Sequence, residues 1–338
     1  MITSNATFVK ALMVLSMIGV AGAARAAPVS TEPAEGVARA SAPAASLETP
    51  ATLQRYSLPW QLRPVAAESM VRINTAAAAF ADGQGNLDIA IPTTFDASYR
   101  LTPHWAPVIK LAFVGNNAPG AALDGTSFAN PMLGATYGRA LGIYRLALFG
   151  ATTIPIGTGG GDAPNLRAAE TNAASMSARP ADAAMFAVDY MAAVAGTDIA
   201  YVGHGFTAQG EVTLLQLVRV RGGDSSGATD AFRTQASAAL HLGYFFGAHF
   251  SLSGDLHYRR WLSTPTPTSA PGARITFAGA GMDTTTVAVG ARVHFRMGKS
   301  VWIRPGVSLV RGLDTRGFDA PLLTPQTTAV QLDVPVVF

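Results

Sequence analysis

Apolar and polar residues alternate with a period of two over most of the chain. In the segment Leu87–Leu101, odd positions such as Ile91 and Phe95 are apolar, whereas even positions such as Asp88 and Asp96 are polar. Successive side chains of an extended strand point to opposite faces, so this alternation predicts a strand with one apolar and one polar face.

The same alternation recurs to the C-terminus and predicts twelve strands. Most are nine residues or longer, which is enough to cross a bilayer when a strand is tilted. The predicted strands are Met70–Ala79, Leu87–Leu101, Trp105–Asn116, Asn130–Leu141, Ile143–Pro155, Val194–Val202, Phe206–Val220, Phe232–Phe246, Phe250–Trp261, Thr284–Arg296, Val301–Arg311 and Ala329–Phe338. We therefore expect an all-β fold, a transmembrane antiparallel β-barrel of about 12 strands.

The connections between these strands alternate in length. Tight turns are expected near Thr102–His104, Gly142, Gly203–Gly205, Gly247–His249 and Met297–Ser300. The other connections are longer, with the exception of Phe80–Asn86, and lie at about Asn117–Ala129, Ile156–Ala193, Arg221–Ala231, Leu262–Asp283 and Gly312–Thr328. Short periplasmic turns and long extracellular loops are typical of outer-membrane barrels, whereas a soluble β-sandwich has no reason to separate its loops in this way.

Aromatic residues on the apolar faces gather near the short turns. This placement predicts a girdle at one membrane interface, where amphipathic rings favour the headgroup level. Its members are Tyr99, Trp105, Tyr137, Tyr144, Tyr201, Phe206, Tyr244, Phe246, Phe250, Phe295 and Phe338, and a sparser outer girdle comprises Phe113, Phe232 and Tyr258.

The C-terminal residues look like an assembly signal. Val334, Val336 and the terminal Phe338 share one parity of the last strand. This ending resembles the terminal β-signal of Gram-negative outer-membrane proteins, which implies recognition by the barrel-assembly machinery. Pro335 lacks a backbone N–H, so we expect the closing seam to be weakened near this end.

Composition agrees with a membrane barrel. The chain is 49% apolar and only 13% charged, against about 25% charged in an average soluble domain, and it has no cysteine. These values argue against a disulfide-stapled module, a Cys-ligated zinc site, a disordered chain and a nucleic-acid binder. We expect the partners to be outer-membrane lipid or lipopolysaccharide and a small solute, with no cofactor and no metal.

The N-terminal residues predict export. Lys10 precedes an apolar run, and Ala24 and Ala26 form a small-x-small cleavage site, so we interpret residues 1–26 as a cleaved Sec signal peptide rather than a membrane anchor. Its removal lowers the formal net charge from +3 to +1, because Lys10 and Arg25 are lost. Residues 27–69 are expected to be a Pro/Ala-rich leader that ends in a short periplasmic element or a plug, followed by the barrel over residues 70–338 in the cell outer membrane.

A family resemblance is carried by two segments, Ser127–Gly138 and Leu146–Gly157. They resemble outer-membrane barrels grouped with transporters of aromatic-degradation (phenol meta-pathway) type, and are similar, more distantly, to the long-chain fatty-acid transporters. The resemblance implies passive uptake of small, often hydrophobic, solutes. It assigns no binding residue to this chain.

Charged residues on the polar faces form a predicted belt inside the barrel. One interpretation, which we favour, is a structural network of ion pairs, and the other is a constriction that selects solutes by charge and size. The belt comprises Asp96, Lys110, Asp198, Glu211, His241, Asp255, Arg292, Arg304 and Asp333. Further basic residues expected in the lumen suggest a mild preference for anions, namely Arg100, Arg145, Arg219, Arg233, Arg259 and Arg296.

Two other function classes remain open. Some outer-membrane barrels are lipases or deacylases, but the segment His249–Gly254 lacks the Asn of the phospholipase motif and supplies only Ser251 and His249. An adhesive or structural barrel would place its function in the long loops. The Ala-rich residues 166–191 are expected to form short helices that cap the pore or fold into its mouth.

Overall fold

The computed structural model describes residues 56–81, 87–116, 126–158, 172, 175, 176, 178–222, 231–263, 284–298, 300–314 and 327–338. The interpretations of residues 1–26 and 27–55, and of most residues in the long loops, concern parts of the chain outside these ranges.

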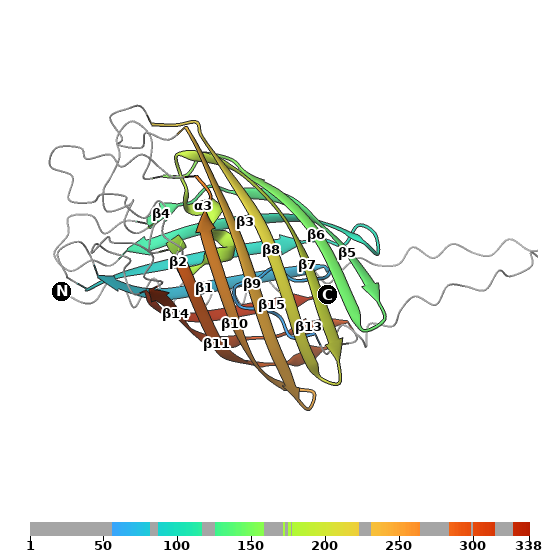
Figure 1. Ribbon diagram of the computed structural model, residues 1–338. Helices are drawn as coiled ribbons and strands as arrows, with labels where there is room; N and C mark the ends of the chain where they lie inside the picture. Colours follow the sequence, from blue (N-terminus) through green and yellow to red (C-terminus); the bar gives the residue numbers. More distant parts are fainter. Residues whose placement is uncertain are drawn as a thin grey trace, which may run out of the picture. The chain divides into compact units, whose positions relative to one another are not determined.

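Twelve antiparallel strands form a closed barrel, as the alternation predicts (Figure 1). Consecutive strands are hydrogen-bonded in chain order, and β15 pairs with β1 from Thr328↔Ala79 to Val337↔Met70, which closes the sheet. Nine of the strands are β1 (Met70–Ala81), β2 (Leu87–Ser98), β3 (Trp105–Asn116), β5 (Met132–Leu141), β6 (Tyr144–Thr153), β7 (Tyr190–Gly203), β8 (Phe206–Arg219), β9 (Phe232–Phe246) and β10 (Phe250–Trp261). The last three are β11 (Thr284–Val293), β14 (Gly306–Asp314) and β15 (Thr328–Val337).

The end of the barrel that carries the short turns departs from regular pairing near the seam. The predicted strands Thr284–Arg296 and Val301–Arg311 are each divided, because short strands β12 (Phe295–Met297) and β13 (Val301–Ile303) form a separate hairpin. On the β14 side, pairing with β15 stops at Gly306↔Asp333 and resumes at Ile303↔Val336. Prolines at 305 and 335 lie in this gap and cannot donate, which explains the interruption. On the β1 side, the register runs through Arg72↔Pro335 without a break.

One further strand was not predicted from the alternation. Residues Thr126–Phe128 form β4, which pairs with β3 beyond the contact of β3 with β5. Three residues are too few for a period of two to be recognised in the sequence.

The exterior of the barrel is apolar and the interior is polar. Outward positions such as Leu148 (58% exposed) and Val289 (61%) contrast with inward positions such as Arg292 and Asp333, which are fully buried. Most of the predicted inner aromatic girdle is exposed on the outer face, as expected for rings that meet lipid headgroups, including Tyr99, Trp105, Tyr144, Tyr244, Phe246, Phe295 and Phe338.

Two basic residues expected inside the barrel are not there. Arg100 and Arg296 are exposed at the end of the barrel that carries the short turns. Regular pairing of β2 ends at Ser98, and β12 belongs to the separate hairpin, so strand parity no longer sets the direction of either side chain. Arg145 and Arg259 are buried as predicted.

Two non-strand segments are buried together with the inward-facing side chains. Residues 56–69 precede β1, and the short helices η2 (Pro180–Asp182) and α3 (Ala183–Phe186) lie between β6 and β7. The predicted short helices within residues 166–191 are therefore confirmed for this part, and their buried residues include Asp182, Met185 and Phe186. Among the described residues, no helix has the length and apolar character required to span a membrane.

Candidate functional site

Residues 56–69 cross the lumen in an irregular conformation and are held by carboxylates of the wall. Asp255 Oδ2 accepts hydrogen bonds from the backbone N–H of Trp60 (2.8 Å) and of Gln61 (2.7 Å), and Glu211 Oε2 accepts one from the N–H of Arg63 (2.8 Å). Prolines at 59 and 64 prevent a regular helix, so these backbone donors have no local partners. Side chains from strands β8 and β10 supply the acceptors instead.

The same segment is fastened to itself and to β8 by Tyr56. The Tyr56 hydroxyl donates to Gln209 Oε1 (2.6 Å) and accepts from the N–H of Val65 (3.0 Å), which closes the segment into a loop. Gln209 Nε2 in turn donates to the carbonyl of Arg63 (2.7 Å). Burial raises the pKa of Tyr56 well above its usual value, so the hydroxyl keeps the proton that it donates.

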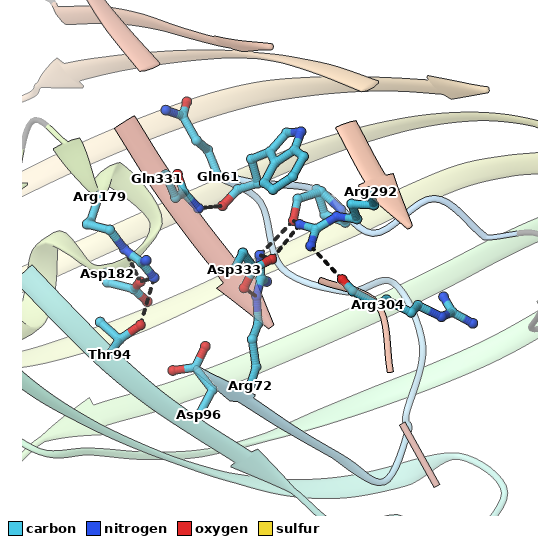
Figure 2. Close-up of polar contacts among 12 residues, drawn as sticks. Gln61, Arg72, Thr94, Asp96, Arg179, Asp182, Arg292, Arg304, Gln331 and Asp333 are labelled. Carbon is cyan, nitrogen blue, oxygen red and sulfur yellow. Dashed lines mark hydrogen bonds and ion pairs between the residues drawn. The ribbon is translucent and has the colours of Figure 1, made fainter. Parts of the chain in front are cut away.

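Two arginines share one carboxylate beside this loop (Figure 2). Arg72 on β1 binds Asp333 through Nε to Oδ1 (2.7 Å) and Nη2 to Oδ2 (2.9 Å), and Arg292 on β11 forms an ion pair with the same Oδ2. Arg72 also donates to the carbonyl of Pro59 (2.8 Å), and the Arg292 guanidinium lies 3.7 Å from the ring centroid of Trp60. Wall and loop therefore share one charged network.

A second ion-pair group holds the short helices against the wall. Asp182 Oδ1 accepts from Lys110 Nζ (2.7 Å). Asp182 Oδ2 binds Arg179, which also donates to Thr94 Oγ1 (2.8 Å) (Figure 2). Burial alone would raise the pKa of Asp182, but Lys110 and Arg179 outweigh it and lower the pKa. Lys110 lies 3.5 Å from Asp96, which links this group to β2.

The predicted belt residues all lie on inward-facing positions, but as local pairs rather than as one ring. Three pairs are direct cross-strand neighbours, namely Asp96 with Lys110, Asp198 with Glu211, and His241 with Asp255. Arg292 and Asp333 lie two strands apart, on β11 and β15, and form an ion pair across Gly306 of β14. Arg304 donates to the backbone carbonyl of Tyr56 (3.2 Å). Most of the belt therefore binds residues 56–69 or another member of the belt, which is the behaviour of a structural network.

Four charged residues of this network were missed in the sequence. Arg63 lies in the irregular segment, and Arg179 and Asp182 lie in a predicted loop, so these three residues did not belong to the polar face of a predicted strand. The sequence pattern could have identified Arg72, because it has the same parity as the other inward-facing residues of β1. The other three are placed by long-range packing.

A cavity of about 70 Å³ remains between residues 56–69 and the wall formed by β1, β2, β3, β5 and β6. Arg63, Glu68, Asp96 and Phe149 are among its lining residues, together with mainly small apolar side chains. A volume of this size holds several water molecules but is smaller than the roughly 150 Å³ that accommodates benzene. Burial raises the pKa of Glu68, against the opposing effect of three arginines.

The candidate catalytic serine contacts a histidine. Ser251 Oγ lies 2.9 Å from His294 Nε2, and both side chains are buried on the inward face, with Phe245 stacked on the imidazole. His294 Nδ1 has no hydrogen-bond partner within the described ranges, so no third group orients this pair. Within the same ranges, no group of three or more His, Asp or Glu side chains is arranged to hold a metal ion.

Comparisons with known structures agree with the barrel. An outer membrane channel from Pseudomonas putida F1 matches with a TM-score of 0.52 and 15% sequence identity, covering 84% of this chain and 100% of that chain. The chain folds as an outer-membrane β-barrel. At this identity the comparison shows the fold alone.

Two of the other matching structures have lower TM-scores. The NanC porin has a TM-score of 0.45 and 8% identity over 79% of this chain and 98% of its own. A Pseudomonas aeruginosa FadL homologue has a TM-score of 0.37 and 10% identity over 80% of this chain and 89% of its own. No protein-family model and no curated protein matches the sequence.

Proposed function

We propose that this protein is an outer-membrane channel for passive uptake of small solutes through a charged lumen, and that residues 56–69 hold the channel closed. One observation carries the proposal. The backbone N–H groups of Trp60 and Gln61 are bound by Asp255, and that of Arg63 is bound by Glu211. The segment fills the lumen without being part of the barrel wall. When the segment leaves these carboxylates, the barrel stays closed, because β1 still pairs with β15.

The energetics allow such a segment to move. Its polar contacts are hydrogen bonds and ion pairs to the wall, which water can replace, whereas each strand of the wall is held by backbone pairing to the strand on either side. A hydrogen bond to a charged group contributes about 1.5–3 kcal/mol net. The three bonds from Asp255 and Glu211 therefore contribute several kcal/mol to the closed state, in addition to the burial of apolar side chains such as Leu58 and Trp60. Removing these bonds should raise the population of the open state.

Liposome swelling tests the proposal. The double variant Asp255→Ala and Glu211→Ala removes the three acceptor contacts, and we expect arabinose to enter liposomes at least about tenfold faster than with the wild-type protein. Asp96→Ala is the matched control, because this inward carboxylate has no hydrogen bond to residues 56–69, and its rate should stay within about twofold of wild type. No solute entry with either protein, both correctly folded, would contradict a channel.

A further inference from the structure

The guanidinium of Arg63 sits in a cage made by other elements. Nη1 donates to Glu211 Oε1 (2.8 Å) and Thr213 Oγ1 (3.3 Å), and Nη2 donates to the carbonyl of Ala181 (2.9 Å). The ring of Phe149 covers the guanidinium, with its centroid 4.1 Å from the central carbon. The cage thus combines residues of β6, β8 and η2 around a side chain from the irregular segment.

Each part of the cage suits an organic cation. A carboxylate, a hydroxyl oxygen and a carbonyl oxygen accept hydrogen bonds, and the face of an aromatic ring attracts positive charge. The Thr213 hydroxyl also donates to Glu211 Oε1 (2.9 Å), which fixes the orientation of the carboxylate. A planar guanidinium matches this arrangement better than a neutral amide of the same shape, because it supplies both the donors and the charge.

A second carboxylate beside the cage is only partly satisfied. Asp198 is the direct cross-strand neighbour of Glu211 and is 1% exposed. Its Oδ1 accepts from Gln209 Nε2 (2.7 Å), but its Oδ2 has no hydrogen-bond partner among the residues that the structure describes. Two buried carboxylates therefore lie side by side on adjacent strands here, and Glu211 is the one that contacts the guanidinium.

The cage adjoins the cavity between residues 56–69 and the barrel wall. The cavity of about 70 Å³ is lined by Arg63 and Phe149, and Glu68 lies on the same cavity. A small solute in this cavity meets the ring and the guanidinium directly.

We infer that Glu211, Phe149, Thr213 and Asp198 form a binding site for guanidinium and alkylammonium solutes, and that Arg63 occupies this site as an internal stand-in. A cationic solute that takes the place of Arg63 removes two of the contacts that anchor residues 56–69 to β8. The inference rests on the proposed function, because it names the class of solute that the same lumen admits. A site of this kind favours cations, whereas the number of basic residues expected in the lumen suggested a mild preference for anions.

Calorimetry on the purified barrel tests the site. In Arg63→Ala the cage is vacated, and we expect saturable, one-to-one binding of methylguanidinium. Methylurea, which has a similar shape and no charge, should bind at least about tenfold more weakly. The added change Glu211→Gln should weaken methylguanidinium binding by a similar factor. The added change Ser308→Ala, at an inward-facing residue of β14 that belongs neither to the cage nor to the lining of the cavity, should alter it by less than about twofold. Absence of saturable binding to folded Arg63→Ala, or equal binding after Glu211→Gln, would overturn the inference.

A measurement on the wild-type chain covers the case in which Arg63→Ala does not fold. Methylguanidinium at millimolar concentration should speed arabinose entry into liposomes, and methylurea should not; equal effects of the two would overturn the site. Calorimetric binding does not depend on conduction. Binding without any solute entry would therefore contradict the proposed channel but support the cation site. Solute entry without binding would support the channel but contradict the cation site.

Discussion

Arg72 and Arg292, which lie 220 residues apart on β1 and β11, bind the same carboxylate oxygen of Asp333. Asp333 is on β15, the strand that closes the barrel, so this contact joins both sides of the seam in the region where prolines interrupt the backbone pairing. All three side chains are almost completely buried. Each arginine also reaches residues 56–69, through Pro59 or Trp60.

Replacing Asp333 by alanine should strongly destabilise the barrel. The change leaves Arg72 and Arg292 buried without their shared counter-ion, and breaking a buried ion pair costs about 3–5 kcal/mol. Urea titration in lipid vesicles measures the free energy of unfolding. The control is Gln331→Ala, which removes an inward polar side chain two residues away whose contact with Trp60 O is long (3.4 Å) and should cost about 1 kcal/mol. Equal costs for the two variants would contradict the role assigned to Asp333.

Glu68→Gln should flatten the dependence of stability on pH. The folded-state pKa of Glu68 is raised above its usual value of 4.5 by burial. Its contribution to stability is therefore complete below pH 4.5 and is lost as the pH rises through the folded-state pKa. Between these limits the wild-type protein should lose unfolding free energy with rising pH, and Glu68→Gln should not, as urea titrations at several pH values will show.

In the same urea titrations, Asp182→Asn should change the pH dependence of the unfolding free energy in the opposite direction. Lys110 and Arg179 lower the pKa of Asp182 despite its burial, so its contribution is present above the usual carboxyl pKa and is lost as the pH falls. The asparagine variant should be less stable than wild type at neutral pH, with the difference shrinking in acid. If both variants shifted the pH profile in the same direction, the environments assigned to Glu68 and Asp182 would be wrong.

Much of this fold could be predicted from single residues and their spacing. The alternation in Leu87–Leu101 placed Asp96 inside and Phe95 outside, because successive side chains of a strand point to opposite faces of the closed sheet. The interior loop could not be predicted in the same way. Many of its contacts join residues far apart in the sequence, such as Arg63 with Glu211 (148 positions) and Trp60 with Gln331 (271 positions), and no local period encodes them. Its aromatic residues and prolines indicated only an irregular plug or periplasmic element.

The serine variant Ser251→Ala should leave the protein's effect on lipids unchanged. Ser251 contacts His294, but both are buried and the imidazole lacks a third partner among the described residues, so the pair has no route to a lipid ester. We expect no hydrolysis of fluorescent phospholipid by the wild-type protein or the variant. Hydrolysis by wild type that disappears in Ser251→Ala would instead support the lipase class.

Single-channel recording in planar bilayers measures the closure of the lumen itself. The claim is that the bonds from Asp255 and Glu211 to residues 56–69 keep the lumen closed. Wild-type protein should show rare, brief openings, and the double variant Asp255→Ala and Glu211→Ala should show discrete openings with an open probability at least about tenfold higher. An unchanged open probability in the folded double variant, or no discrete conductance from either protein, would contradict the account.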